Sequence, residues 1–98
     1  MKEMTAQEVL EKLNNGETLN LIDVREDEEV AEGKIAIAQH IPLGDIPNRL
    51  DELDKSKSYI MICRSGGRSG NACNFLQAQG YDVTNMTGGM LDWEGDVK

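Results

Sequence analysis

The sequence predicts an α/β fold in which a central, mostly parallel sheet carries helices on both faces. Three short β-rich apolar segments, residues 19–24, 58–62 and 81–86, alternate along the chain with segments of helical spacing. Such alternation is typical of strand–helix–strand units, which build parallel sheets. The chain has 98 residues, about the size of one domain, so we expect residues 1–98 to form a single domain.

The first half of the chain shows clear helix and strand boundaries. Thr5 and Glu8 form a capping-box pattern, which predicts a helix that starts after Thr5 and ends near Gly16. The elements expected next are a buried strand at 19–24, a short acidic helix at 26–32 that Gly33 ends, and a strand segment at 35–41 that Pro42 limits.

The second half repeats the alternation. Ile46, Leu50 and Leu53 lie at helical spacing, which predicts a helix over 45–53. The elements expected after it are a strand at 58–62, a glycine-bearing loop at 63–69, a helix at 71–79, a strand at 81–86, a turn at Gly88 and Gly89, and a last helical turn at 90–93.

Composition excludes several functional classes. The net charge is −8, which argues against nucleic-acid binding and against an anionic membrane surface. The longest apolar run, residues 59–63, is far shorter than the roughly 20 residues of a membrane span. The N-terminus shows no apolar signal core, and two cysteines are too few for a disulfide scaffold, so we expect a reduced, cytoplasmic setting.

The loop after the strand at 58–62 carries the chemistry. Cys63 closes the strand, Gly66 and Gly67 let the backbone present its N–H groups inward, and the next helix adds its positive end. Arg64 and Arg68 add full positive charge. These features favour the thiolate of Cys63 and would hold an anionic group bound to its sulfur. Any one of them alone is ordinary; their coincidence in seven residues predicts a reactive thiolate.

Several motifs together resemble the rhodanese-like domain family. The loop at 63–69 resembles the active-site loop of that family, and residues 21–25 resemble its Asp-Val-Arg strand end. The other matching segments are the acidic helix at 28–33, the Ile-Pro segment at 41–43, and the Gly-Gly-x-x-x-Trp motif within 87–93. The resemblance covers nearly the whole chain and implies a rhodanese-like fold.

The resemblance also implies sulfurtransferase activity. Cys63 would be the nucleophile that carries a persulfide, taken from a donor such as thiosulfate and passed to cyanide or a thiol. Arg68 would close the loop and help to hold the anion, while Arg64 faces the mouth and attracts an anionic donor, with salt-dependent capture. The residues expected to bind substrate through the loop are Arg64, Ser65, Gly66, Gly67 and Ser69.

Two other functions use the same loop. A sulfur carrier or interaction module would take sulfur from a persulfide-donating protein and turn over small molecules poorly. A phosphatase or arsenate reductase is disfavoured, because four residues separate Cys63 from Arg68 whereas the related phosphatases have five. We expect no cofactor and no metal, because one His and two separated cysteines give no ligand spacing. We expect a monomer, since no long exposed apolar stripe is evident.

Some residues depart from the family pattern or invite a role that we do not assign. Lys34 stands where the family usually has His, and His40, several residues later, is expected to be a loop or packing residue. Cys73 is expected to be a core residue within the helix rather than a resolving thiol. The pair Asp23 and Arg25 is expected to tie neighbouring segments together. Trp93 is expected to be a packing anchor.

Overall fold

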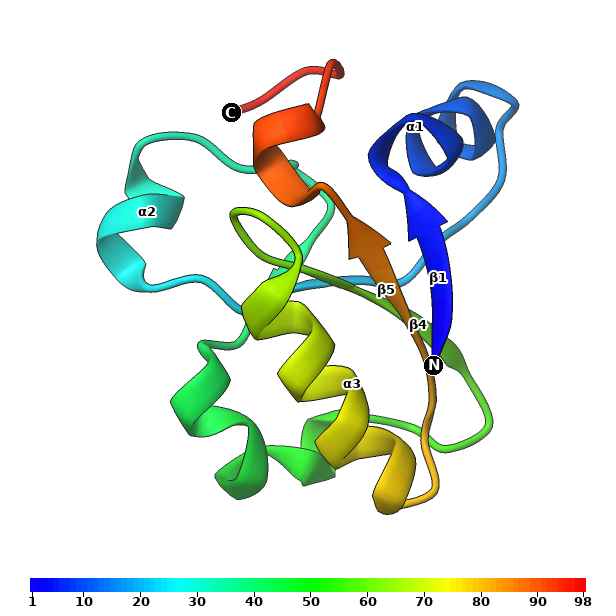
Figure 1. Cartoon of the computed structure of the whole chain (residues 1–98), viewed down its shortest axis with the longest axis vertical. Coiled ribbons are helices and arrows are strands. Elements are labelled where there is room, and N and C mark those ends of the chain that lie inside the picture. The colour runs from blue at the N-terminus through cyan, green and yellow to red at the C-terminus, as the bar shows by residue number, and fades with distance from the viewer.

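The computed structural model describes all residues, 1–98, and contains a five-stranded sheet in the order β1-β5-β4-β2-β3. Every pairing is parallel. The strands are β1 (Lys2–Thr5), β2 (Leu21–Asp23), β3 (Gln39–His40), β4 (Ser58–Ile62) and β5 (Asp82–Thr87). The α/β fold with a central parallel sheet that the sequence predicted is therefore confirmed (Figure 1).

The chain also forms three α-helices and three 3₁₀ helices. They are α1 (Ala6–Asn14), α2 (Asp27–Ala31), α3 (Gly67–Ala78), η1 (Leu43–Asn48), η2 (Leu50–Glu52) and η3 (Gly89–Asp92). The capping box of Thr5 and Glu8 starts α1 as predicted, with both reciprocal hydrogen bonds in place. None of these helices is long and apolar enough to cross a membrane.

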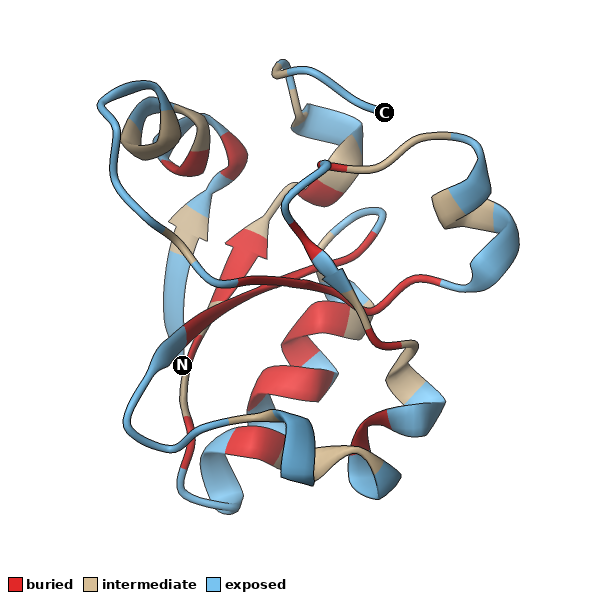
Figure 2. Ribbon diagram, turned by 180° about the vertical axis from the view of Figure 1, so that it is seen from behind, coloured by how far each residue is buried: buried red, intermediate tan, exposed pale blue.

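Helices cover both faces of the sheet and enclose two apolar clusters. On one face, α3, η1 and η2 pack on Met61, Tyr59 and their neighbours. On the other face, α1 and η3 pack on Ile60, Ile62 and Met86. Burial is concentrated along the central strands and the inner side of α3 (Figure 2). The central strand β4 therefore lies between two packed layers, and its carboxyl end is held rigidly.

Strand β1 was not anticipated from the sequence. Its side chains are mostly exposed and polar, so they show no apolar alternation. It exists because its backbone pairs with β5 at the sheet edge, in the register Lys2–Thr84 to Thr5–Thr87.

The strand segment expected at 35–41 was mostly wrong. Only Gln39–His40 pair with β2, while the amide of Ala38 donates to the carbonyl of Ile35 at 3.0 Å and closes a turn. Ile35 and Ala38 reach the core from this turn. Their apolar character thus reflects packing of a turn and not a strand.

The helix expected at 45–53 forms as two 3₁₀ pieces. Pro47 lacks the N–H that an α-helix would need, and the surrounding amides bond three residues back, as Arg49 does to Ile46. The helix expected at 71–79 begins earlier, at Gly67. That earlier start moves Arg68 and Ser69 from the loop into the first turn of α3.

Candidate active site

Cys63 lies at the carboxyl end of β4, where the chain turns directly into α3. Gly66 precedes the helix with φ of 106°, a conformation that favours glycine. This turn directs the Gly66 amide at the sulfur, with 3.0 Å between the nitrogen and Cys63 Sγ. The turn from strand to helix is therefore short, and it brings a backbone donor to the thiol.

The thiol of Cys63 is buried, and protein groups donate hydrogen bonds to its sulfur. Cys63 is 1% exposed, and Ser69 Oγ lies 3.3 Å from its sulfur. Burial by itself raises the pKa of Cys63, and hydrogen bonds from the Ser69 hydroxyl and amide oppose it. The amides of Gly66 and Ser65 add to the opposing effect, and the resulting pKa lies below the ordinary value of a thiol. The environment thus favours a thiolate.

Asn85 supports this arrangement and was missed in the sequence. It lies on β5 and is 5% exposed. Its side-chain amide donates to the carbonyl of Gly66 at 3.0 Å, and its oxygen accepts from the Ser69 hydroxyl. A hydroxyl has one proton, so Asn85 and the Cys63 sulfur compete for it. A polar residue in the middle of a buried strand was the signal that could have identified Asn85.

The carbonyls of the loop are held from the opposite side by η3. The amides of Met90 and Leu91 donate to the carbonyls of Cys63 and Arg64 at 2.9 and 3.0 Å. Gly89, with φ of 56°, packs so closely that a Cβ atom there would lie 2.5 Å from both carbonyl oxygens. The turn predicted at Gly88 and Gly89 is therefore a clamp on the cysteine loop. Because the carbonyls point toward this clamp, the loop amides are free to face the sulfur.

Arg68 was expected to help hold an anion at the loop, but in the structure it pairs with a carboxylate of the protein. Its guanidinium donates to both carboxylate oxygens of Glu29 on α2, at 2.6 and 2.7 Å. Hydrogen bonds from Arg68 lower the pKa of Glu29 to about 2. Glu29 therefore ties α2 to α3. The donors around Cys63, rather than a free Arg68 cation, account for its lowered pKa.

Arg64 is exposed and forms no ion pair. It lines a cavity of about 280 Å³ beside the loop, together with Glu32, Leu91 and Val97. Ser65 and Gly67 are also exposed on the loop, whereas Ser69 is fully buried. Of the predicted loop residues, Ser65, Gly66 and Ser69 therefore direct donors at the sulfur. Arg68 is paired with Glu29, and Arg64 is the cation that remains unpaired.

The residues expected to be structural behave as such. Asp23 and Arg25 form a buried pair, joined at 2.8 Å, and Arg25 also donates to the carbonyl of Gly33 at 2.9 Å. This confirms the tie between neighbouring segments. Lys34 donates its ammonium to the carbonyl of Ala38 at 2.6 Å, and His40 Nε2 lies 2.7 Å from the carbonyl oxygen of Arg25.

Cys73 and Trp93 lie outside the cysteine loop at 63–69. Cys73 is fully buried, has a free thiol, and has its pKa raised to about 11 by burial. Trp93 packs against the cluster under α1, and its indole N–H donates to the carbonyl of Asp96 at 3.2 Å. No group of three or more His, Cys, Asp or Glu side chains lies close enough together to hold a metal ion.

Comparison with known proteins agrees with this fold. The family model for the rhodanese-like domain matches residues 5–96. The chain belongs to the rhodanese-like domain family. A solved rhodanese-like domain protein from Staphylococcus aureus superposes with a TM-score of 0.94 at 38% identity, over 100% of this chain and 97% of that one.

Two Bacillus subtilis relatives of the rhodanese-like chain carry functional names. The chain is 53% identical, over its full length and 95% of the relative, to the protein named "Putative sulfurtransferase YtwF". It is 38% identical to "Putative sulfur carrier protein YrkF", over 98% of this chain and 52% of that longer protein. This rhodanese-like domain thus has a sulfurtransferase or sulfur-carrier role.

Proposed function

We propose that the protein transfers a sulfane sulfur from a donor such as thiosulfate to cyanide or a thiol through a persulfide on Cys63. The observation that carries the proposal is the buried sulfur facing the Gly66 amide and the Ser69 hydroxyl. These donors favour an anionic sulfur, and an anionic sulfur is the nucleophile that the reaction requires. Rhodanese-like family membership supports the same chemistry.

The proposed reaction has two half-reactions. The Cys63 thiolate attacks the outer sulfur of thiosulfate, the sulfur–sulfur bond of the donor breaks, and sulfite leaves with the bonding electron pair. The enzyme then carries a persulfide. Cyanide, or the thiolate of an acceptor, attacks the outer sulfur of this persulfide, and the thiolate of Cys63 leaves. Atoms and charge balance in each step, and no cofactor takes part.

Each loop residue has a proposed part in these steps. The amides of Ser65, Gly66 and Ser69 stabilise the thiolate and persulfide. Arg64 attracts the dianionic donor against the negative charge of the whole chain, so capture weakens as salt rises. Arg68 shapes the loop through Glu29 and adds its charge at longer range.

A second candidate is a protein-to-protein sulfur carrier. The name of the longer Bacillus subtilis relative favours it. A carrier would load from the persulfide of a donor protein such as a cysteine desulfurase and would turn over small molecules slowly. Both candidates require the same persulfide.

The experiment is intact-mass spectrometry after thiosulfate treatment, with a second aliquot then treated with cyanide. We expect a gain of one sulfur atom that cyanide removes and that the Cys63→Ser variant does not show. No gain with thiosulfate would overturn small-molecule sulfur transfer, and loading by a desulfurase persulfide would then establish the carrier. Hydrolysis of a phosphate ester without sulfur loading would instead indicate a phosphatase.

A further inference from the structure

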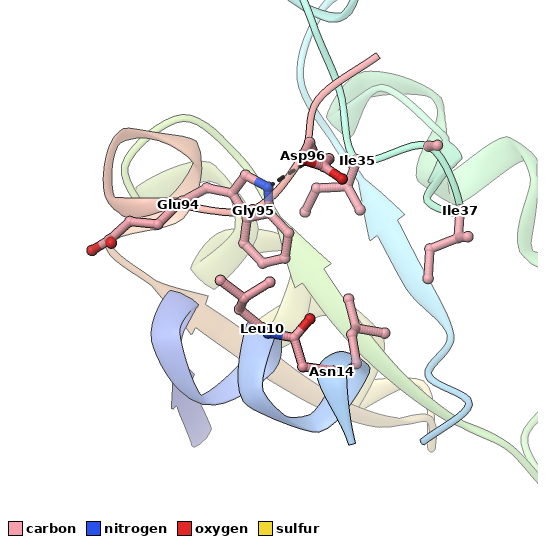
Figure 3. Close-up of a pocket in the computed structure, with 10 residues that line it drawn as sticks. Leu10, Asn14, Ile35, Ile37, Glu94, Gly95 and Asp96 are labelled. Atoms are coloured by element: carbon pink, nitrogen blue, oxygen red, sulfur yellow. Dashed lines mark hydrogen bonds between the residues drawn. The ribbon is translucent and has the colours of Figure 1, made fainter. Parts of the chain in front are cut away.

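An open apolar groove lies between α1 and the C-terminal segment (Figure 3). None of its lining residues belongs to the cysteine loop at 63–69. Its volume is about 490 Å³, a size that receives side chains of a ligand or partner. Leu10 and Leu13 of α1 form one wall, Ile35 and Ile37 form a second, and Trp93 forms a third. Ile37 is 60% exposed, so the groove presents apolar surface directly to water.

The charged residues that line the groove are all acidic. Glu94 and Asp96 line it, and none of its ten lining residues is basic. Two cations near the groove are engaged, because the Lys34 ammonium binds the Ala38 carbonyl and Lys12 pairs with Glu17. Lys98, two residues beyond Asp96, has no ion pair but does not line the groove. An occupant that places a cation beside the acidic rim would therefore meet complementary charge.

We propose that this groove binds a segment of a partner protein that carries apolar side chains flanked by Lys or Arg. The apolar side chains lie against Ile37 and Trp93, and the cations face Glu94 and Asp96. A second copy of this chain is a poor occupant, because each copy carries a net charge of −8 and two such copies repel. The mode matches the docking of an amphipathic basic helix in an apolar groove.

The groove is connected to the cysteine loop through η3. Trp93 follows η3 directly, and the η3 amides of Met90 and Leu91 hold the carbonyls of Cys63 and Arg64. A partner seated on Trp93 thus lies at the carboxyl edge of the sheet, the edge that also carries the loop. The groove is an interaction surface whether or not the partner exchanges sulfur, so its test is independent of the persulfide test.

The probe is a synthetic peptide of about 14 residues, made of leucine and lysine in an amphipathic helical pattern. Trp93 is the single tryptophan of the chain, so its fluorescence reports events in the groove. The matched control peptide has glutamate at every lysine position. We expect saturable binding of the lysine peptide, and backbone NMR shifts that cluster on α1, residues 35–37 and residues 93–96.

Two matched variants locate the binding. Ile37→Ser removes a groove side chain that is 60% exposed, and Leu91→Ser removes one outside the groove that is 62% exposed. We expect Ile37→Ser to weaken the lysine peptide about tenfold, the effect of losing a buried isoleucine contact. We expect Leu91→Ser to change the affinity less than about twofold. Both side chains are exposed, so both variants keep the fold, which their melting temperatures will verify.

Three results would overturn the proposal. One is equal binding of the glutamate peptide, which would remove the argument from charge. Another is an unchanged affinity in Ile37→Ser, which would place the peptide elsewhere on the acidic surface. The third is a shift of groove resonances when the protein alone is concentrated, which would make a second copy the occupant.

Discussion

The two cysteines of this chain are equally buried and yet differ in acidity. Cys63 is 1% exposed and Cys73 is 0% exposed. Donors around the sulfur lower the pKa of Cys63, whereas burial raises the pKa of Cys73 to about 11. Burial alone therefore produces an inert thiol, and a reactive one requires hydrogen-bond donors that face the sulfur.

The difference follows from where each cysteine meets α3. Cys63 precedes the helix, where the first-turn amides have no partner within the helix and can donate to the sulfur. Cys73 lies inside the helix, where the amides already bond to carbonyls one turn back. It packs among apolar neighbours such as Leu76 and Ala72. The amides at the start of α3 can therefore donate to the sulfur of Cys63, whereas the amides around Cys73 are already hydrogen-bonded within the helix.

The largest expected contrast is in alkylation. At neutral pH we expect iodoacetamide to label Cys63 at least about a hundredfold faster than Cys73, because the thiolate is the reacting species and the pKa is lowered at Cys63 but raised to about 11 at Cys73. Peptide mass spectrometry of timed samples measures both rates. The urea-unfolded chain is the control, in which both cysteines should react alike. Equal rates in the folded protein would contradict the comparison.

The next largest effect concerns the clamp that shapes the loop. A Cβ atom in Gly89→Ala would lie 2.5 Å from the carbonyl oxygens of Cys63 and Arg64, and φ there is 56°. We expect a loss of about 3 kcal/mol in unfolding free energy and no sulfur loading. Urea unfolding measures the former. Gly44→Ala, with nothing within 4 Å and no positive φ, is the matched control and should be nearly neutral; similar losses in both variants would contradict the clamp.

Removing one hydrogen-bond donor should reduce the difference in pKa between Cys63 and Cys73. In Ser69→Ala the sulfur of Cys63 loses the hydroxyl at 3.3 Å, and the pKa of Cys63 should rise. We expect alkylation of Cys63 at neutral pH to slow about fivefold, with the pH profile moved to higher pH. The rate at Cys73 serves as the internal control. An unchanged profile would mean that the loop amides alone stabilise the thiolate.

The smallest effect concerns the ion pair beside the loop. The pKa of Glu29 is lowered from 4.5 to about 2 in the folded protein, so its charged form stabilises the fold above about pH 4.5. This contribution is lost as pH falls toward 2, because the unfolded chain binds the proton first.

The variant Glu29→Gln tests this contribution. It should be less stable than the parent by about 1 kcal/mol at neutral pH, since the pair is partly solvated. The difference should vanish near pH 2. Thermal unfolding of both proteins across this pH range measures it, with Glu28→Gln, an exposed neighbour, as the control. A stability difference that is constant with pH would show that the packing of the Glu29 side chain, and not its charge, produces the effect.

The parts of the fold set by local patterns were predictable from sequence. The capping box of α1 and the apolar run of β4 have local signals, and both were predicted at or near their observed bounds. Strand β1 and the turn at Ile35 depend on partners far along the chain, and single-sequence patterns do not carry that information. The glycine and cysteine pattern of the loop was similarly local and was sufficient to place Cys63.

The supporting residues of the site depend on tertiary contacts. Glu29 and Arg68 are 39 positions apart, and Asn85 lies 19 positions from Gly66. Their spacing along the chain carries no signal of these contacts, so Arg68 was assigned to the anion and Glu29 was given no partner. The fold alone determines which side chains pair, because it brings distant positions together.

The pairing of the first strand with the last has a consequence for how the chain reaches its native state. Lys2 lies opposite Thr84, so the edge of the sheet cannot form before residues near the C-terminus are available. During synthesis the N-terminal segment must wait for β5, and loop closure over nearly the whole chain slows this step. The η3 clamp follows β5 directly, so during synthesis the contacts that hold the cysteine loop cannot form before residues 89–92 have been made.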